Sequence, residues 1–90
     1  MPVGTTSVDF GASGSKVAQV TVTGQTGLAS GSHVEAFVMA ESTADHNAVE
    51  HRLAPIKLVC GAVVADTGFT IYAASEWTLT GAFAVRWVWA

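Results

Sequence analysis

The sequence has little charge and almost no cysteine. Only 12% of its 90 residues are charged, and four Lys plus Arg stand against seven Asp plus Glu, for a formal net charge of −3. This acidic balance removes the electrostatic attraction on which affinity for nucleic acid or an anionic membrane depends, so we expect neither as a partner. The single Cys60 has no second cysteine for an intrachain disulfide or a structural zinc site.

Long apolar runs and leader-like segments are also missing. The longest apolar run, residues 58–65, has eight residues and includes Gly61. A membrane-spanning helix needs roughly 20. Residues 1–7 contain neither a basic region nor an apolar segment, so they do not predict a secretory signal. We therefore expect a protein that is made and kept in a cytoplasm, or released from one by lysis.

The sequence is instead rich in hydrophobic residues, which alternate with polar ones. Hydrophobic residues make up 50% of the chain, which excludes disorder. The length of residues 1–90 suffices for a single domain. From 83 to 89 the odd positions Phe83, Val85, Trp87 and Trp89 share one face, as in a β-strand. Gly61 predicts a bulge or tight turn. Similar short segments occupy 8–10, 16–22, 33–39, 56–60, 62–64 and 68–73.

Glycine-rich turn signals separate these segments, so the pattern predicts an all-β fold. Five to seven short strands fit a small antiparallel β-sandwich, with about six strands in a single domain, or a small barrel. Residues 40–52 lack the strand pattern and are expected to form an exposed polar loop. Thr43 or Asp45 could cap one helical turn there, ending near Glu50.

The polar loop holds the densest group of potential metal ligands. If it were helical, His46 and Glu50 would lie one turn apart on the same face and could share a metal ion, while His51 would point elsewhere. A metal-dependent hydrolase would be centred on these three residues. Their spacing matches no zinc-peptidase pattern and a closed site needs about four ligands, so we expect no metal. His46 and His51 could still form a pH-responsive pair.

Patterns typical of catalysis are absent from the sequence. It has no phosphate-binding loop and no Gly-x-Ser-x-Gly elbow, and its acidic residues are spread singly. Cys60 lies among apolar residues, which raise the pKa of a thiol and make it inert, so it is expected to be a small core residue. We predict that the protein is not an enzyme and needs no cofactor.

The aromatic content points to self-assembly. A 90-residue monomer buries only about 60 to 65% of the surface of its unfolded chain, which leaves little room for three Trp, four Phe and one Tyr. Either all three Trp share one core, or at least one lies at a subunit contact, which we expect. The predicted assembly is a symmetric homo-oligomer, a trimer. Its expected contacts are Phe37, Phe83, Trp87 and Trp89, with Arg86 paired to Glu35 within or between subunits or else facing water.

Two stretches carry a resemblance to a known class of proteins. Residues 67–72, Thr-Gly-Phe-Thr-Ile-Tyr, and residues 80–90, Thr-Gly-Ala-Phe-Ala-Val-Arg-Trp-Val-Trp-Ala, resemble the C-terminal half of small structural proteins of tailed bacteriophages. Residues 32–38 and the loop 45–51 are similar too. The resemblance implies a non-enzymatic virion subunit, either a capsid decoration, head-fibre or tail-associated protein. Such a subunit would assemble in the host cytoplasm and contact other virion proteins.

The same Gly-Phe-Thr-Ile and Val-x-Trp order also resembles H-type lectins. That family consists of six-stranded antiparallel sandwiches that trimerise and bind sugars at subunit clefts. The alternative function is therefore a carbohydrate-binding module that recognises a glycan on the host surface. In this interpretation Trp77 or Tyr72 stacks on the sugar, and its hydroxyls donate hydrogen bonds to Asp45, Asn47 and Glu50.

Overall fold

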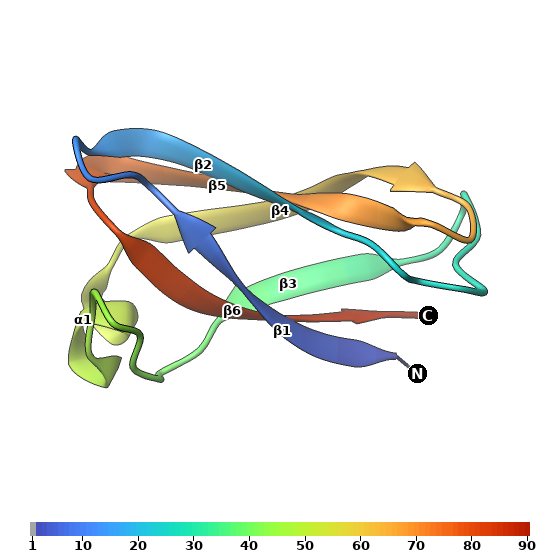
Figure 1. The fold of residues 1–90 in the computed structure, drawn as a ribbon, viewed down its shortest axis with the longest axis horizontal. Coiled ribbons are helices and arrows are strands. Elements are labelled where there is room, and N and C mark those ends of the chain that lie inside the picture. The colour runs from blue at the N-terminus through green and yellow to red at the C-terminus, as the bar shows by residue number, and fades with distance from the viewer. Residues whose placement is uncertain (1) are drawn as a thin grey trace.

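Two three-stranded antiparallel sheets face each other in the computed structural model, which describes residues 2–90 (Figure 1). Sheet A has the strand order β1-β6-β3 and sheet B the order β2-β5-β4, which confirms the all-β prediction. No helix in the described part of the chain is long and apolar enough to cross a bilayer. The elements are β1 (Val3–Asp9), β2 (Ser15–Val22), β3 (Val34–Val38), α1 (Ala48–Leu53), β4 (Ile56–Val64), β5 (Gly68–Leu79) and β6 (Ala82–Trp89).

The core lies between the two central strands, β5 and β6. Every second residue of β6, from Phe83 to Trp89, is buried, as the alternation predicted. Phe69 of β5 meets Trp87 of β6 edge to face, with 5.5 Å between ring centroids. The buried hydrophobic residues are Val8, Phe10, Leu28, Phe69, Ile71, Ala73, Phe83, Val85, Trp87 and Trp89.

This core corrects three of the expected subunit contacts. Phe83, Trp87 and Trp89 are only 1%, 7% and 8% exposed, because the face of β6 that carries them packs onto sheet B. They cannot reach a partner subunit without unfolding the sandwich. Trp77 is 61% exposed, so the alternative in which all three Trp share one core is also wrong.

The predicted irregularity at Gly61 is a β-bulge. The register between β4 and β5 shifts between Gly61 and Val64, and Ala62 has a φ of 51°. This left-handed backbone is uncommon for a residue with a Cβ and is typical of a bulge. The two short apolar runs around Gly61 are therefore parts of one strand.

The chain ends meet at one end of sheet A. The Trp89 N–H donates to the Pro2 carbonyl at 3.1 Å, and both ends lie opposite α1 along the long axis (Figure 1). The α1 end therefore lies away from both chain ends. The longest extent of the molecule is 35 Å, against 20 and 18 Å for the other two.

Candidate functional site

The polar segment 40–52 is fastened to β6 rather than exposed throughout. The Asp45 carboxylate accepts a hydrogen bond from the Ala82 N–H at 2.8 Å, and the Thr43 hydroxyl donates to the Ala82 carbonyl at 2.8 Å. The same hydroxyl accepts from the N–H groups of Asp45 and His46 at 3.2 and 3.1 Å. These bonds hold the loop in a fixed path before the helix begins.

The helix starts later than expected because Thr43 and Asp45 are already occupied. Its N-cap is Asn47, whose side chain accepts from the Glu50 N–H at 2.9 Å, while the Glu50 carboxylate accepts from the Asn47 N–H at 2.9 Å. This reciprocal capping box stabilises a helix N-terminus. The helix continues to Leu53, so a cap at Thr43 or Asp45 and an end near Glu50 were wrong predictions.

His51 is buried under α1 and joins the helix to β6. Its Nδ1 lies 2.8 Å from the Asn47 carbonyl oxygen, and its Nε2 lies 2.8 Å from the Ala84 backbone nitrogen. Because the Ala84 N–H must donate, Nε2 carries no proton, and Nδ1–H then donates to Asn47. The arrangement requires a neutral imidazole, and for His51 the prediction of an exposed loop was wrong.

His46 is held in the opposite way, by two acceptors. Its Nδ1 lies 3.2 Å from the Glu50 carboxylate, its Nε2 faces the Thr80 carbonyl, and its ring stacks on Phe83 with 4.0 Å between centroids. Burial lowers the His46 pKa, but the hydrogen bonds to Thr80 and Glu50 and the charges of Glu50 and Asp45 outweigh it, so the pKa is raised above 6.5. These acceptors stabilise the charged form of His46 relative to a free imidazole.

The predicted metal ligands do not assemble. His46 and Glu50 do contact each other, as their spacing indicated, although His46 precedes the N-cap Asn47 and lies outside the helix. His51 points to Ala84 instead. Among residues 2–90 no group of three or more His, Cys, Asp or Glu side chains is arranged to hold a metal ion. The pKa of Glu50 is lowered by the Asn47 N–H and by His46, so its carboxylate serves the helix cap and the ion pair.

A shallow groove beside α1 brings together two of the predicted ligand-binding residues. Its volume is about 180 Å³, and Trp77, at the end of β5, and Glu50 both line it. Trp77 and Leu53 are strongly exposed, so the groove has apolar walls and one carboxylate at its edge. The remaining lining residues are His46, Leu53, Ala54, Leu79 and Phe83.

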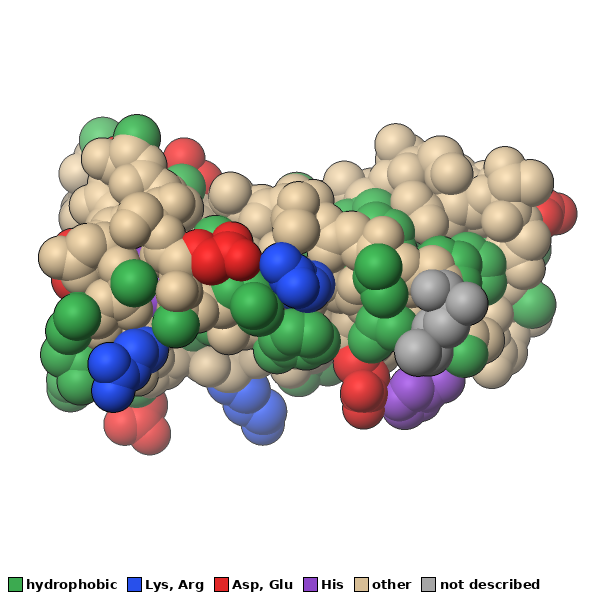
Figure 2. Space-filling view, turned by 90° about the horizontal axis from the view of Figure 1, so that it is seen from below, with side chains coloured by type: hydrophobic (Ala, Val, Ile, Leu, Met, Phe, Trp, Pro, Cys, Tyr) green, Lys and Arg blue, Asp and Glu red, His purple; other side chains and the backbone are tan. Residues whose placement is uncertain are grey.

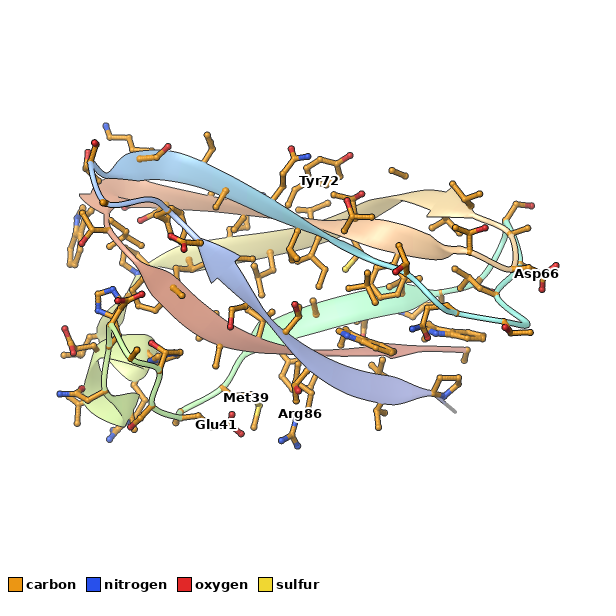
Figure 3. All side chains as sticks on the ribbon, viewed as in Figure 1. Met39, Glu41, Asp66, Tyr72 and Arg86 are labelled. Atoms are coloured by element: carbon orange, nitrogen blue, oxygen red, sulfur yellow. The ribbon has the colours of Figure 1, made fainter. Side chains whose placement is uncertain are left out.

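The other three predicted ligand residues lie elsewhere or are occupied. Tyr72 projects from the outer face of sheet B, in register with Gln19 of β2 and Val59 of β4, and does not line the groove (Figure 3). The Asp45 side chain accepts from the Ala82 N–H of β6, and the Asn47 side chain accepts from the Glu50 N–H of α1. Of the five residues predicted to bind a sugar, only Trp77 and Glu50 therefore line the groove.

The outer face of sheet A carries apolar side chains around an ion pair (Figure 2). Arg86 Nη2 lies 3.2 Å from the Glu41 carboxylate, and both side chains are about half exposed (Figure 3). Within one subunit the predicted pairing of Arg86 with Glu35 is wrong, because Phe37 rather than Glu35 lies opposite Arg86 in the register of β3 and β6. Glu35 instead pairs with His33 at 3.1 Å.

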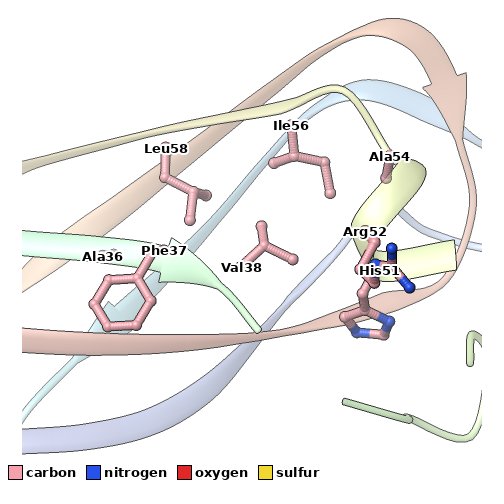
Figure 4. Close-up of a pocket in the computed structure, with 8 residues that line it drawn as sticks. All are labelled: Ala36, Phe37, Val38, His51, Arg52, Ala54, Ile56 and Leu58. Carbon is pink, nitrogen blue, oxygen red and sulfur yellow. The ribbon is translucent and has the colours of Figure 1, made fainter. Parts of the chain in front are cut away.

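A second, larger groove runs between the edges of β3 and β4 (Figure 4). It comprises two adjoining hollows of about 390 and 370 Å³ that share Ala36, Phe37 and Leu58. Burial raises the pKa of the Cys60 thiol at one end, and the charge of Glu35 adds to this effect. The sequence signal for this groove is the short strand β3, whose inward residues Val34, Ala36 and Val38 are too small to close the side of the sandwich.

Comparison with known proteins gives no family assignment. No protein-family model matches the chain, and no curated protein or solved structure matches it.

Proposed function

We propose that this chain is a non-enzymatic structural subunit of a bacteriophage particle that assembles as a symmetric homo-oligomer. The observation that carries the proposal is the apolar surface. Nine large hydrophobic side chains among residues 2–90 are at least 41% exposed. Apolar patches of a few hundred Å² on a soluble protein usually mark contact surfaces. These side chains are Val3, Val17, Phe37, Val49, Leu53, Val59, Val64, Tyr72 and Trp77.

The distribution of these side chains suits a subunit that is covered on several sides. Val3 and Phe37 lie on the outer face of sheet A, and Val17, Val59 and Tyr72 on that of sheet B. A decoration or tail-associated protein contacts its own copies and other virion proteins, which requires more than one apolar surface. The resemblance of residues 67–72 and 80–90 to phage structural proteins supports this assignment and assembly in the host cytoplasm.

The polar groups of the loop and helix also favour a structural role. The side chains of Asp45, Asn47 and His51 each bind a backbone group, and Glu50 pairs with both His46 and the Asn47 N–H. A general acid or base must reach a substrate proton, and these groups are engaged within the fold. The cluster therefore acts to dock α1 onto the sandwich.

The solution mass tests self-assembly. Light scattering at micromolar concentrations should show a homo-oligomer, and a stable monomer would contradict the proposal. Mass spectrometry of purified phage particles tests the virion assignment. It should detect the chain at a stoichiometry that matches the symmetry of the particle, and its absence would contradict that assignment.

A carbohydrate-binding module is the second candidate, and the position of Trp77 beside Glu50 favours it. An exposed indole offers a flat apolar face to a sugar ring, and the carboxylate accepts hydrogen bonds from hydroxyl groups. A host surface glycan would be the partner. On a glycan array Trp77→Ala should abolish binding, whereas Tyr72→Ala, which removes an exposed aromatic ring on another face, should preserve it. Equal losses in both variants, or no bound glycan at all, would exclude this function.

A further inference from the structure

The outer edge of β3 has unpaired backbone groups. His33 and Ala90 exchange both N–H···O=C bonds at 3.0 Å, and the Met39 N–H donates to Ala84 at 3.2 Å. Bonding alternates along an antiparallel pair, so Glu35 and Phe37 also face β6. The N–H and C=O groups of the residues between them, Val34, Ala36 and Val38, point away from β6. No other backbone or side-chain partner takes up these groups within residues 2–90.

The other three edges carry features that discourage pairing. β2 contains Lys16 and a register shift between Ser15 and Val17, and β4 contains Lys57 and the bulge after Gly61. β1 follows Pro2, and its central residues, Gly-Thr-Thr-Ser, are small or polar. Natural proteins use lysine, proline and bulges to protect sheet edges. β3, with the sequence Val-Glu-Ala-Phe-Val, has none of these and is regular throughout.

We propose that β3 is the seam between two copies of this chain, pairing antiparallel with the partner's β3 about a two-fold axis at Ala36. The inference rests on the proposed self-assembly and specifies its contact. Because a two-fold contact joins copies in pairs, it gives a dimer in place of the trimer expected from the sequence. In this register Ala36 faces the partner's Ala36 and Val34 faces the partner's Val38, which provides about six backbone hydrogen bonds. The two sheets A become one continuous sheet of six strands, and the contact is isologous.

The charges of β3 match this pairing. On the outer face Glu35 lies opposite the partner's Phe37, so no acidic residue directly faces another across the seam. Glu35 Oε1 also lies 3.1 Å from Nε2 of His33, the residue that precedes β3. Like charges directly opposite each other would destabilise such a pair, and this register avoids them.

The apolar groove between β3 and β4 also favours a second copy of the chain as the occupant. Ile56, Leu58 and Val38 line the groove next to the free edge, so a partner that extends sheet A brings its own groove against this one. The proposed pairing therefore covers the apolar lining of the groove as well as the strand edge. A short strand from another protein would pair with the free N–H and C=O groups of β3 but would leave the apolar side chains of β4 exposed.

Opposite charges at position 37 test the seam. Phe37→Glu places an acid opposite the partner's Glu35, whereas Phe37→Lys places a base there, and both remove the same aromatic ring. Because Phe37 is 45% exposed, both variants should fold, as urea unfolding can verify. The dimer dissociation constant of Phe37→Glu should exceed that of Phe37→Lys by at least about tenfold, since two symmetric pairs are affected. Equal constants would overturn the register. Val59→Glu, on the outer face of sheet B, is the matched control and should leave dimerisation unchanged.

Amide hydrogen exchange tests the same seam without mutation. At high concentration the N–H groups of Val34, Ala36 and Val38 should exchange at least about tenfold more slowly than in a dilute sample. A monomer at all concentrations overturns both the seam and the proposed assembly. A stable oligomer in which Ala36 exchanges freely overturns the seam alone and leaves the proposed function standing.

Discussion

His51 accepts a hydrogen bond from the backbone N–H of Ala84, with 2.8 Å between the two nitrogens. The Met39 N–H donates to the Ala84 carbonyl, but the Met39 carbonyl then accepts from Glu41 as the chain leaves the sheet. The Ala84 N–H would have no partner in sheet A, and the imidazole takes the place of a strand residue. The helix thus completes the sheet ladder where β3 ends.

Removing this acceptor should destabilise the fold. His51→Ala leaves the Ala84 N–H without a partner inside the protein, and we expect the free energy of unfolding in urea to fall by about 2 kcal/mol. His51→Gln retains an acceptor on a side chain of similar reach and should lose less than half as much. A similar loss in both variants would show that packing, rather than the hydrogen bond, matters at this position.

Gly4 should not tolerate a side chain. A Cβ at this position would lie 2.2 Å from Cζ2 of Trp87, whose ring is buried against Phe69 and cannot move freely. Overpacking of this kind costs roughly 1–3 kcal/mol, so Gly4→Ala should lower the free energy of unfolding by that amount. Gly31→Ala, where a Cβ meets nothing within 4 Å, is the control and should change stability little. A neutral effect at Gly4 would mean that Trp87 repacks.

The His46–Glu50 pair should make stability depend on pH in a defined window. The pKa of His46 is raised above 6.5, so its stabilising contribution is complete below pH 6.5 and is lost as pH rises through the folded value. The pKa of Glu50 is lowered from 4.5, so its contribution is present above pH 4.5 and is lost as pH falls through the folded value. Both contributions are complete between pH 4.5 and 6.5.

The stability difference between the wild type and His46→Gln reports this window. It should widen as pH falls towards 6.5, stay level to pH 4.5 and narrow below that. Urea unfolding across the pH range measures it, and NMR titration of the His46 ring should give a pKa above 6.5. A difference that is constant with pH would show that the ion pair does not form in solution.

Only one of the three indoles should be accessible to solvent. Acrylamide should quench the fluorescence of Trp77, which is exposed, and leave Trp87 and Trp89 largely shielded in the core. Trp77→Phe should remove the quenchable part of the fluorescence. It should cost little stability, because the Trp77 side chain is mostly exposed to solvent. Strong residual quenching in that variant would indicate that sheet A opens in solution.

The strands could be predicted from local alternation, but the side of the sheet that becomes buried could not. The pattern of Phe83 and Trp87 fixes one shared face, whereas its burial depends on β6 lying in the centre of sheet A, which only long-range pairing determines. Arg86 illustrates the same limit. Its partner Glu41 lies in a loop, and sequence alternation carries no information on where that loop passes.

The candidate site was predictable only where spacing along the chain determines contacts. His46 and Glu50 meet at the predicted spacing, although His46 precedes the N-cap Asn47 and so lies just outside the helix. The start of α1 could not be predicted from residue preference alone, since Thr43, Asp45 and Asn47 are all good caps. Tertiary bonds to Ala82 occupy the first two and leave the third for the helix.

The bond from Trp89 to Pro2 has a consequence for how the chain can be connected to other proteins. Because residues 2 and 90 lie together at the pole opposite α1, a polypeptide attached to either would emerge from the same place. A short linker could join the two ends and allow the chain to be opened elsewhere, for example in the turn around Gly24. If the sandwich were inserted into a loop of a larger protein, its two connections would lie side by side. The α1 end, with Trp77, would then point away from that protein.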